Sequence, residues 1–244
     1  PPTRSSGVPS AERMITGVSI FAARKAVMHY TQEQGIKNVT LDDIYLGNGA
    51  SELISLATNA LLDAGDELLL PAPDYPLWTA VTSLSGGTPV HYTCDEANGW
   101  MPDLDDIRAK ITPNTKGIVV INPNNPTGTF LPADAIAAFL AKVPPTVVVV
   151  LDEAYNEFLE PEQQYDSTAW VRQYPNLLVS RTFSKAYGLA GLRVGYGIAQ
   201  PQLTDLLNRI RQPFNVNSLA QAAAVAALND AEFLRQSAQL NAAG

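Results

Sequence analysis

The sequence predicts an α/β fold with a mostly parallel sheet and helices on both of its faces. Apolar, strand-like runs alternate along the chain with segments of helical periodicity, which is the pattern of consecutive βα units. The strand-like runs are apolar throughout, as expected for strands that helices cover on both faces. Polar residues follow three of these runs, and such sheets bind ligands at the carboxyl ends of their strands.

In the amino-terminal half, turn residues separate short apolar runs from periodic segments. Gly47-Asn48-Gly49 turns the chain into the first helix, Gly86-Gly87 ends the second, and Asp103 is a favourable N-cap for the third. In chain order the predicted elements are the strand 44–46, the helix 51–62, the strand 67–70, the helix 76–85, the strand 89–93 and the helix 104–111.

The carboxyl-terminal half continues the alternation and ends in an alanine-rich tail. Pro123 and Pro126 stop the strand before them, since proline cannot donate a hydrogen bond to a strand ladder. The predicted elements are the strand 117–121, the helix 133–143, the strands 146–151, 177–180 and 194–198, and a mostly helical tail from residue 203.

Composition and charge argue against several classes of protein. The net charge of −8 provides no basic field for nucleic acid, and no apolar run is long enough to cross a bilayer. Cys94 is the only cysteine, which excludes an internal disulfide. With only His29, His91 and Cys94 as soft ligands, a structural zinc site is not expected. Residues 1–10 lack the apolar core of a secretory signal, so a cytoplasmic protein is expected.

The turn after the predicted strand 177–180 carries Lys185. An amine that forms a Schiff base needs such a setting, in which the lysine holds an aldehyde and nearby groups hold an anionic tail. Thr182, Ser184 and Arg193 supply hydroxyls and a guanidinium for that tail. Most lysines are solvated surface charges, so Lys185 alone is weak evidence for a Schiff-base lysine, and the interpretation depends on the residues described next.

Three further residues follow predicted strands and would complete a site for pyridoxal phosphate. Asp152 follows the apolar run 146–151, where an ionised carboxylate needs a partner such as a protonated pyridine nitrogen. Asn125, in a loop restrained by two prolines, and Tyr155 can both reach the phenolic oxygen of the same ring. Each has a plainer alternative: a capping carboxylate, a residue of a tight turn and an amphipathic loop tyrosine, respectively.

The start of the predicted helix 51–62 offers a phosphate site. Free N–H groups and the helix dipole favour an anion there, beside Ala50 and Ser51. Glu52 occupies the third-glycine position of a dinucleotide fingerprint and the chain has no Gly-Lys-Ser/Thr, so a Rossmann cofactor and a nucleotide P-loop are disfavoured. Tyr75 could stack on a planar ring, or it could be a half-buried turn tyrosine.

These motifs resemble the class I and II aminotransferases of PLP fold type I. The matching segments are Gly47 to Glu52, Pro73 to Pro76, Asn124 to Gly128, Asp152 to Tyr155, and Ser184-Lys185 with Arg193, in the order of the family. The resemblance implies a PLP-binding large domain at 19–230 after a poorly defined segment at 1–18. It also implies that the small domain is truncated or absent, with 231–244 as the start of a truncated helical segment.

The resemblance assigns a role to each candidate residue. Lys185 would form the Schiff base and move protons, Asp152 would pair with the pyridine nitrogen, and Tyr155 would be the third catalytic residue. Asn125 and Tyr155 would hold the ring oxygen, and Tyr75 would stack on the ring. The phosphate would be held by Ala50, Ser51, Thr182 and Arg193, and Glu52 and Ser184 complete the cofactor-binding set.

The resemblance implies the transfer of an amino group between an amino donor and a 2-oxo acid, with pyridoxal 5'-phosphate as cofactor and a homodimeric assembly. The part from 21 to about 128 is similar to bacterial glutamate–pyruvate (alanine) aminotransferases, and the remainder is similar to histidinol-phosphate aminotransferases. Because Lys185 lies in the second part, histidinol-phosphate transamination is expected, with alanine transamination as the alternative.

Two departures from the family leave a non-catalytic PLP-binding scaffold as a further alternative. No motif after Arg211 matches the arginine with which the family's small domain binds the substrate carboxylate. Met14 or a neighbour stands where the family has a tyrosine that reaches the partner subunit's phosphate. A fused DNA-binding regulator is disfavoured, because the sequence has no basic helix-turn-helix segment.

Overall fold

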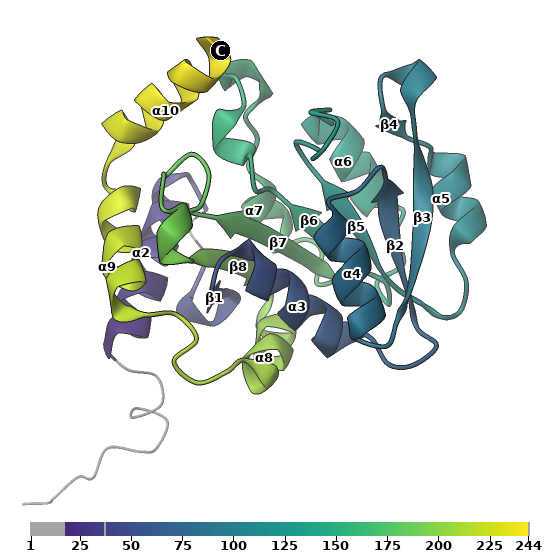
Figure 1. The fold of residues 1–244 in the computed structure, drawn as a ribbon, viewed down its shortest axis with the longest axis horizontal. Coiled ribbons are helices and arrows are strands. Elements are labelled where there is room, and N and C mark those ends of the chain that lie inside the picture. Colours follow the sequence, from purple (N-terminus) through teal and green to yellow (C-terminus); the bar gives the residue numbers. More distant parts are fainter. Residues whose placement is uncertain (1–17, 37, 244) are drawn as a thin grey trace, which may run out of the picture.

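The computed structural model describes residues 18–36 and 38–243, and its described part is built on one eight-stranded sheet (Figure 1). The strand order is β1-β8-β7-β6-β5-β2-β3-β4. All predicted strands are present, and the two-residue strand β4 was not predicted. The strands are β1 (Ile44–Gly47), β2 (Glu67–Ala72), β3 (Thr88–Asp95), β4 (Met101–Pro102), β5 (Thr115–Ile121), β6 (Val148–Asp152), β7 (Leu177–Thr182) and β8 (Gly195–Ala199).

The directions of the strands decide which residues meet at one edge of the sheet. β7, β6, β5, β2 and β3 pair in parallel, which confirms the predicted, mostly parallel sheet. β8 lies antiparallel between β7 and β1, and β4 is antiparallel to β3. Because β8 is reversed, its first residue, Gly195, pairs with Thr182, the last residue of β7. Arg193, just before β8, therefore lies near the turns that follow the parallel strands.

The predicted helices are all present, and the carboxyl-terminal tail forms three of them. Asp103 caps its helix as predicted, since its carboxylate accepts hydrogen bonds from the backbone N–H groups of Asp105 and Asp106. The helices are α2 (Val18–Glu33), α3 (Ala50–Leu61), α4 (Pro76–Leu84), α5 (Leu104–Lys110), α6 (Ala133–Leu140), α7 (Ser167–Trp170), α8 (Pro201–Ile210), α9 (Ser218–Leu228) and α10 (Ala231–Ala243).

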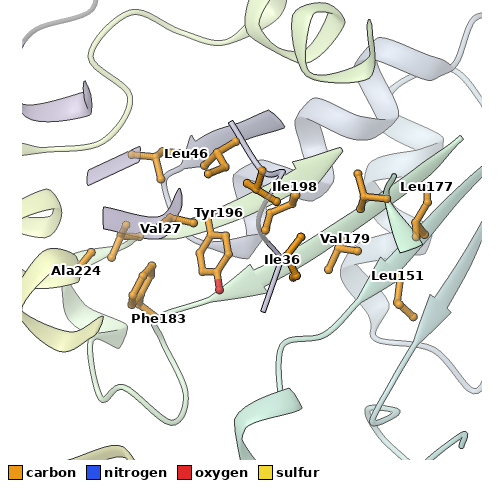
Figure 2. Close-up of a cluster of buried hydrophobic side chains, with 14 of the residues drawn as sticks. Val27, Ile36, Leu46, Leu151, Leu177, Val179, Phe183, Tyr196, Ile198 and Ala224 are labelled. Atoms are coloured by element: carbon orange, nitrogen blue, oxygen red, sulfur yellow. The ribbon is translucent and has the colours of Figure 1, made fainter. Parts of the chain in front are cut away.

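Helices cover both faces of the sheet, as predicted. Buried side chains of α3, α4 and α8 form one apolar cluster on one face, and those of α2, α6 and α9 belong to a second cluster on the other. Alternate residues of β7 face the two clusters, because Leu177 and Val179 belong to the second and Leu178 to the first. Figure 2 shows the second cluster, in which Val27 of α2 and Ala224 of α9 lie beside the sheet residues.

Helix α2 was not predicted from the sequence, because the face that it buries is narrow. Among its residues 21–33, for which burial is described, the buried ones are Ala23, Val27 and Thr31, spaced four apart, and they include one small and one polar side chain. Such a face gives little of the apolar periodicity by which amphipathic helices are recognised.

The structure describes the carboxyl-terminal helix of the chain but not its first 17 residues. The segment predicted at 1–18 lies outside the described residues except for Val18. Helix α10 begins at Ala231 and buries none of its residues, and it contacts the short 3-10 turn Asn156–Phe158. Among the residues that the structure describes, no helix combines the length and the apolar character that crossing a bilayer requires.

Candidate active site

A pocket of about 160 Å³ opens at the edge of the sheet where β5, β6 and β7 end. Six separate segments of the chain contribute to it, so the fold brings together residues that are far apart in sequence. Ten of the eleven predicted site residues line this pocket: Ala50, Ser51, Tyr75, Asn125, Asp152, Tyr155, Thr182, Ser184, Lys185 and Arg193.

Asp152 is the last residue of β6 and is only 4% exposed. Its Oδ2 accepts a hydrogen bond from the indole Nε1 of Trp78 at 3.0 Å, whereas its Oδ1 is buried without a partner among the described residues. Burial raises the pKa of Asp152 to about 6, although the Trp78 hydrogen bond and the nearby backbone N–H of Ala154 oppose the rise. A buried oxygen without a donor is costly, and a protonated ring nitrogen is a donor that fits it.

Asn125 and Tyr155 meet beside Lys185. The side-chain Nδ2 of Asn125 donates a hydrogen bond to the phenolic oxygen of Tyr155 at 3.0 Å. The Nζ atom of Lys185 lies 5.0 Å from the centroid of the Tyr155 ring, which is a favourable cation–π distance. Lys185 is exposed, so its amine is accessible from solvent. The two residues predicted to hold the ring oxygen thus converge next to the predicted nucleophile.

Helix α4 brings Tyr75 to the pocket. Tyr75 is the N-cap residue of α4, and Pro76 at the first helical position fixes the direction in which the helix starts. Tyr75 lines the pocket and is 38% exposed, so part of its ring is free to contact a planar ligand.

Arg193 and the start of α3 form the cationic end of the pocket. Arg193 has a left-handed φ of 58°, and its Nη1 donates to the carbonyl of Ala190 at 3.1 Å. Its guanidinium lies against Gly49, the N-cap residue of α3. The Ser184 N–H donates to Thr182 Oγ1 at 3.1 Å, while Ser184 Oγ is buried without a partner in the described part of the chain. A guanidinium, a helix amino terminus and a free hydroxyl together suit a phosphate.

Gly49 is required where Arg193 and α3 approach each other. Its φ of 77° and ψ of 170° are nearly exclusive to glycine, and an added Cβ would lie 2.5 Å from Arg193 Nη2. We therefore expect Gly49→Ala to lower the free energy of unfolding by about 1–3 kcal/mol, measured in urea. Because the guanidinium is displaced, the variant should also bind the phosphate of the pyridoxal phosphate predicted from the sequence less well, measured as the ratio of dissociation constants for pyridoxal phosphate and pyridoxal.

Gly86→Ala is the matched control for this prediction. Gly86 has a φ of 85°, but an added Cβ there would meet no atom within 4 Å. This variant should lose stability through backbone strain and keep the wild-type preference for the phosphate. An equal change of preference in both variants would show that strain, and not the position of Arg193, is responsible.

Glu52 is the one predicted site residue that does not line the pocket. Its Oε2 accepts hydrogen bonds from the backbone N–H of Asn48 and from Nδ2 of Asn215, both at 2.6 Å. A carboxylate in the first turn of a helix is stabilised by the helix dipole. The geometry therefore gives Glu52 a structural role in holding the turn before α3, in place of the predicted contact with the cofactor.

Four residues of the site were not predicted from the sequence. Ile54, Ile121 and Ala154 line the pocket. Ile121 is the last residue of β5 and Ala154 follows Asp152 closely, so their positions could have been inferred from the strand ends. Trp78 contacts Asp152 across 74 positions of the sequence, and no motif signals that contact.

A buried ion pair lies behind the pocket, between β6 and β7. Arg181 Nε donates to Glu153 Oε2 at 2.9 Å, and Ser167 Oγ donates to the same oxygen at 2.7 Å. Glu153 is fully buried and Arg181 is 9% exposed. Burial lowers the pKa of Arg181, but the charges of Glu153, Tyr196 and Glu157 and the hydrogen bond to Glu153 together outweigh it and hold that pKa well above its ordinary value. Glu153 directly follows Asp152, and Arg181 directly precedes Thr182. The ion pair therefore connects the chain next to two residues that line the pocket.

The sequence of the chain matches a known protein family over most of its length. The sequence profile described as "Aminotransferase class I and II" matches residues 11–243. The chain belongs to the class I and II aminotransferases. This confirms the resemblance inferred from the motifs, and the members of this family use pyridoxal phosphate.

Relatives of known name fall into both enzyme groups that the motifs indicated. The chain is 68% identical over 201 residues to histidinol-phosphate aminotransferase 2 of Ralstonia nicotianae, covering 82% of this chain and 53% of that protein. It is 46% identical over 190 residues to glutamate–pyruvate aminotransferase AlaA of Escherichia coli, covering 78% and 47%. The solved histidinol-phosphate aminotransferase of Sinorhizobium meliloti, in complex with pyridoxal-5'-phosphate, aligns with a TM-score of 0.80 at 27% identity, over 91% of this chain and 58% of that one.

This class I and II aminotransferase chain spans about half the length of the relatives that it matches. Its eight-stranded sheet and the surrounding helices correspond to the large domain of the family, as the resemblance implied. Met14, where the family's phosphate-binding tyrosine was expected, lies outside the described residues.

Proposed function

We propose that this chain binds pyridoxal phosphate and serves an aminotransferase that moves amino groups between an amino donor and a 2-oxo acid, with Lys185 as the amine that bonds the cofactor. The observation that carries the proposal is that Lys185, Asp152 and Arg193 line one pocket. An accessible amine, a buried carboxylate with a free oxygen and a guanidinium match the aldehyde, the ring nitrogen and the phosphate of this cofactor.

Bound pyridoxal phosphate supplies an aldehyde for amine exchange and a protonated ring that withdraws electrons from the substrate Cα. Asp152 would accept the hydrogen bond of the ring nitrogen through Oδ1 and keep the positive charge there. Asn125 and Tyr155 would orient the ring by its oxygen, and Tyr75 would cover one ring face. Lys185 would bond the aldehyde and, once displaced by the substrate amine, would carry the proton removed from Cα.

The phosphate would lie between α3 and Arg193. Backbone N–H groups at the first turn of α3 and the hydroxyls of Ser51, Thr182 and Ser184 surround that end of the pocket. Arg193 would supply the balancing positive charge. This end would fix the cofactor in place while its aldehyde exchanges amines at the other end.

The proposed function is tested by trapping the cofactor on the protein. Adding pyridoxal phosphate should give a new absorption band, and borohydride should then fix one cofactor on Lys185, identified by peptide mass spectrometry. Lys185→Ala should abolish the trapped adduct, whereas Lys142→Ala, at an exposed lysine outside the pocket, should leave it intact. An adduct of unchanged yield in Lys185→Ala would disprove the assignment.

For the substrate we propose histidinol phosphate as amino donor and 2-oxoglutarate as acceptor, because the relative at 68% identity is named a histidinol-phosphate aminotransferase. Exchange between glutamate and pyruvate is the alternative, supported by the relative at 46% identity. Glutamate converts the cofactor in either case, because it is the product formed from 2-oxoglutarate. Single-turnover mixing of the loaded protein with histidinol phosphate or with alanine, followed by the absorbance of the pyridoxamine form, distinguishes the two. Conversion by neither donor would favour a non-catalytic PLP-binding scaffold. Assembly as a homodimer is also proposed, from the family resemblance alone.

A further inference from the structure

We propose that Trp78 is a positioning residue for the pyridine end of the cofactor: its indole N–H holds Oδ2 of Asp152 so that Oδ1 is presented to the ring nitrogen. The inference rests on the proposed function and adds a residue to it. Trp78 does not line the pocket and would not touch the cofactor itself, so it would act only through Asp152.

The geometry of the Asp152 carboxylate supports this role. The two oxygens of Asp152 are in different situations, since Oδ2 has the Trp78 donor at 3.0 Å and Oδ1 has no partner among the described residues. One fixed hydrogen bond limits rotation of the carboxylate about its Cβ–Cγ bond. The remaining oxygen then has a defined direction, which a single donor from a ring nitrogen can meet.

Trp78 is itself held rigidly. It is 1% exposed and packs in the apolar cluster that contains Ile54, Leu70 and Ile121. Its backbone N–H donates to the carbonyl of Tyr75 at 3.0 Å. The indole N–H is the only polar group of the side chain, and Asp152 is its partner. The first turn of α4 thus connects the residue proposed to stack on the ring with the residue that aligns the carboxylate.

The electrostatic surroundings of Asp152 also suit a neutral donor. The groups that act on Asp152 are the Trp78 donor, the Ala154 backbone N–H and the carboxylate of Glu153, and Tyr45 from β1 is coupled to it by charge. Trp78 is a neutral donor, so it favours the ionised carboxylate without neutralising its charge. A lysine or arginine in its place would also favour the ionised form, but would compete with the protonated pyridine for the same negative charge.

The test compares two probes in wild-type chain and in Trp78→Phe. The probes are pyridoxal phosphate and its carbocyclic analogue, in which C–H replaces the ring nitrogen, and dissociation constants are measured by equilibrium dialysis. Wild type should prefer pyridoxal phosphate. We expect Trp78→Phe to reduce that preference by roughly tenfold or more, because a hydrogen bond to a charged group is lost. Affinity for the analogue should change little, since it has no nitrogen for Asp152 to meet.

The ratio of the two affinities separates positioning from folding. A general packing defect in Trp78→Phe would weaken both probes equally and leave the preference unchanged, which would overturn the inference. Trp170→Phe, at a partly buried tryptophan that packs against the cluster on the opposite face of the sheet, should keep the wild-type preference. If wild type binds neither probe, the proposed function and this inference both fail. If wild type binds pyridoxal phosphate on Lys185 and the preference survives in Trp78→Phe, only the role of Trp78 fails.

Discussion

Replacing Asp152 by asparagine should make the ligand-free chain more stable at neutral pH, by about 2 kcal/mol. Burial raises the pKa of Asp152 from its ordinary value of 3.8 to about 6 in the folded chain. Between these two pH values the folded chain retains a proton that the unfolded chain releases. Stability is therefore lost as the pH rises through this window, and a difference of this size corresponds to about 3 kcal/mol.

Asparagine avoids this loss because it does not ionise. It can still accept the hydrogen bond of Trp78 through its side-chain oxygen, but its amide N–H₂ group takes the place of the free Oδ1 and lacks an acceptor. That unsatisfied donor offsets about 1 kcal/mol of the gain. The advantage of the variant should shrink below pH 6 and disappear near pH 4, where the folded carboxyl is protonated and only about half of the unfolded carboxyl is ionised.

Urea unfolding at pH 7 and pH 4 measures this effect. Asp63→Asn, which removes an exposed carboxylate, should change stability by less than about 0.5 kcal/mol at either pH. Saturating pyridoxal phosphate should reverse the order at pH 7, because only the wild type can pair with a protonated ring nitrogen and gain stability from it. Equal stability of the two ligand-free chains at pH 7 would contradict the prediction.

Removing the charge of Arg181 should have the largest destabilising effect of any change discussed. Arg181→Met should lower the free energy of unfolding by about 3–5 kcal/mol, because Glu153 would remain fully buried without its partner. Methionine retains much of the arginine side-chain volume, so a cavity contributes little. Ser167 still donates to Glu153 after the change, but one neutral hydrogen bond does not compensate a buried carboxylate.

The control for this prediction is the double variant Arg181→Met with Glu153→Gln. Once the buried charge is also removed, most of the lost stability should return, since a neutral amide is far cheaper to bury than an unpaired carboxylate. Chemical unfolding of the two single variants and the double variant gives the coupling energy between the residues. If the double variant is as unstable as Arg181→Met alone, packing and not charge holds this part of the sheet.

The parts of the fold and site that were predictable follow from local pattern and sheet topology. Asn125, Asp152 and Lys185 each follow an apolar run, and parallel strands bring their carboxyl ends to one edge, so a shared pocket could be expected before any coordinates. The position of Arg193 depends on the antiparallel direction of β8, which the sequence pattern did not indicate. The family resemblance supplied only its expected role at the phosphate.

The remaining features depend on contacts between distant segments. The hydrogen bond from Trp78 to Asp152 joins a helix to a strand far along the chain, and an apolar aromatic residue on a helix gives no sign of a polar partner. Glu52 was assigned to the pocket because it belongs to a motif, but its direction is set by Asn215, which lies in the loop between α8 and α9. Sequence patterns predict which strand ends meet, whereas side-chain direction depends on packing.

The antiparallel placement of β8 has a consequence for how the cofactor would be handled. Lys185 and Arg193 lie on the single connection between β7 and β8, and both ends of that connection are anchored by the pairing of Thr182 with Gly195. Lys185, which would bond the cofactor, and Arg193, which would bind its phosphate, therefore belong to one loop that is held at both ends, and they would move together during thermal motion. The distance between Lys185 and Arg193 would therefore stay nearly constant and would set the length of cofactor that fits, even while the helices around the pocket move.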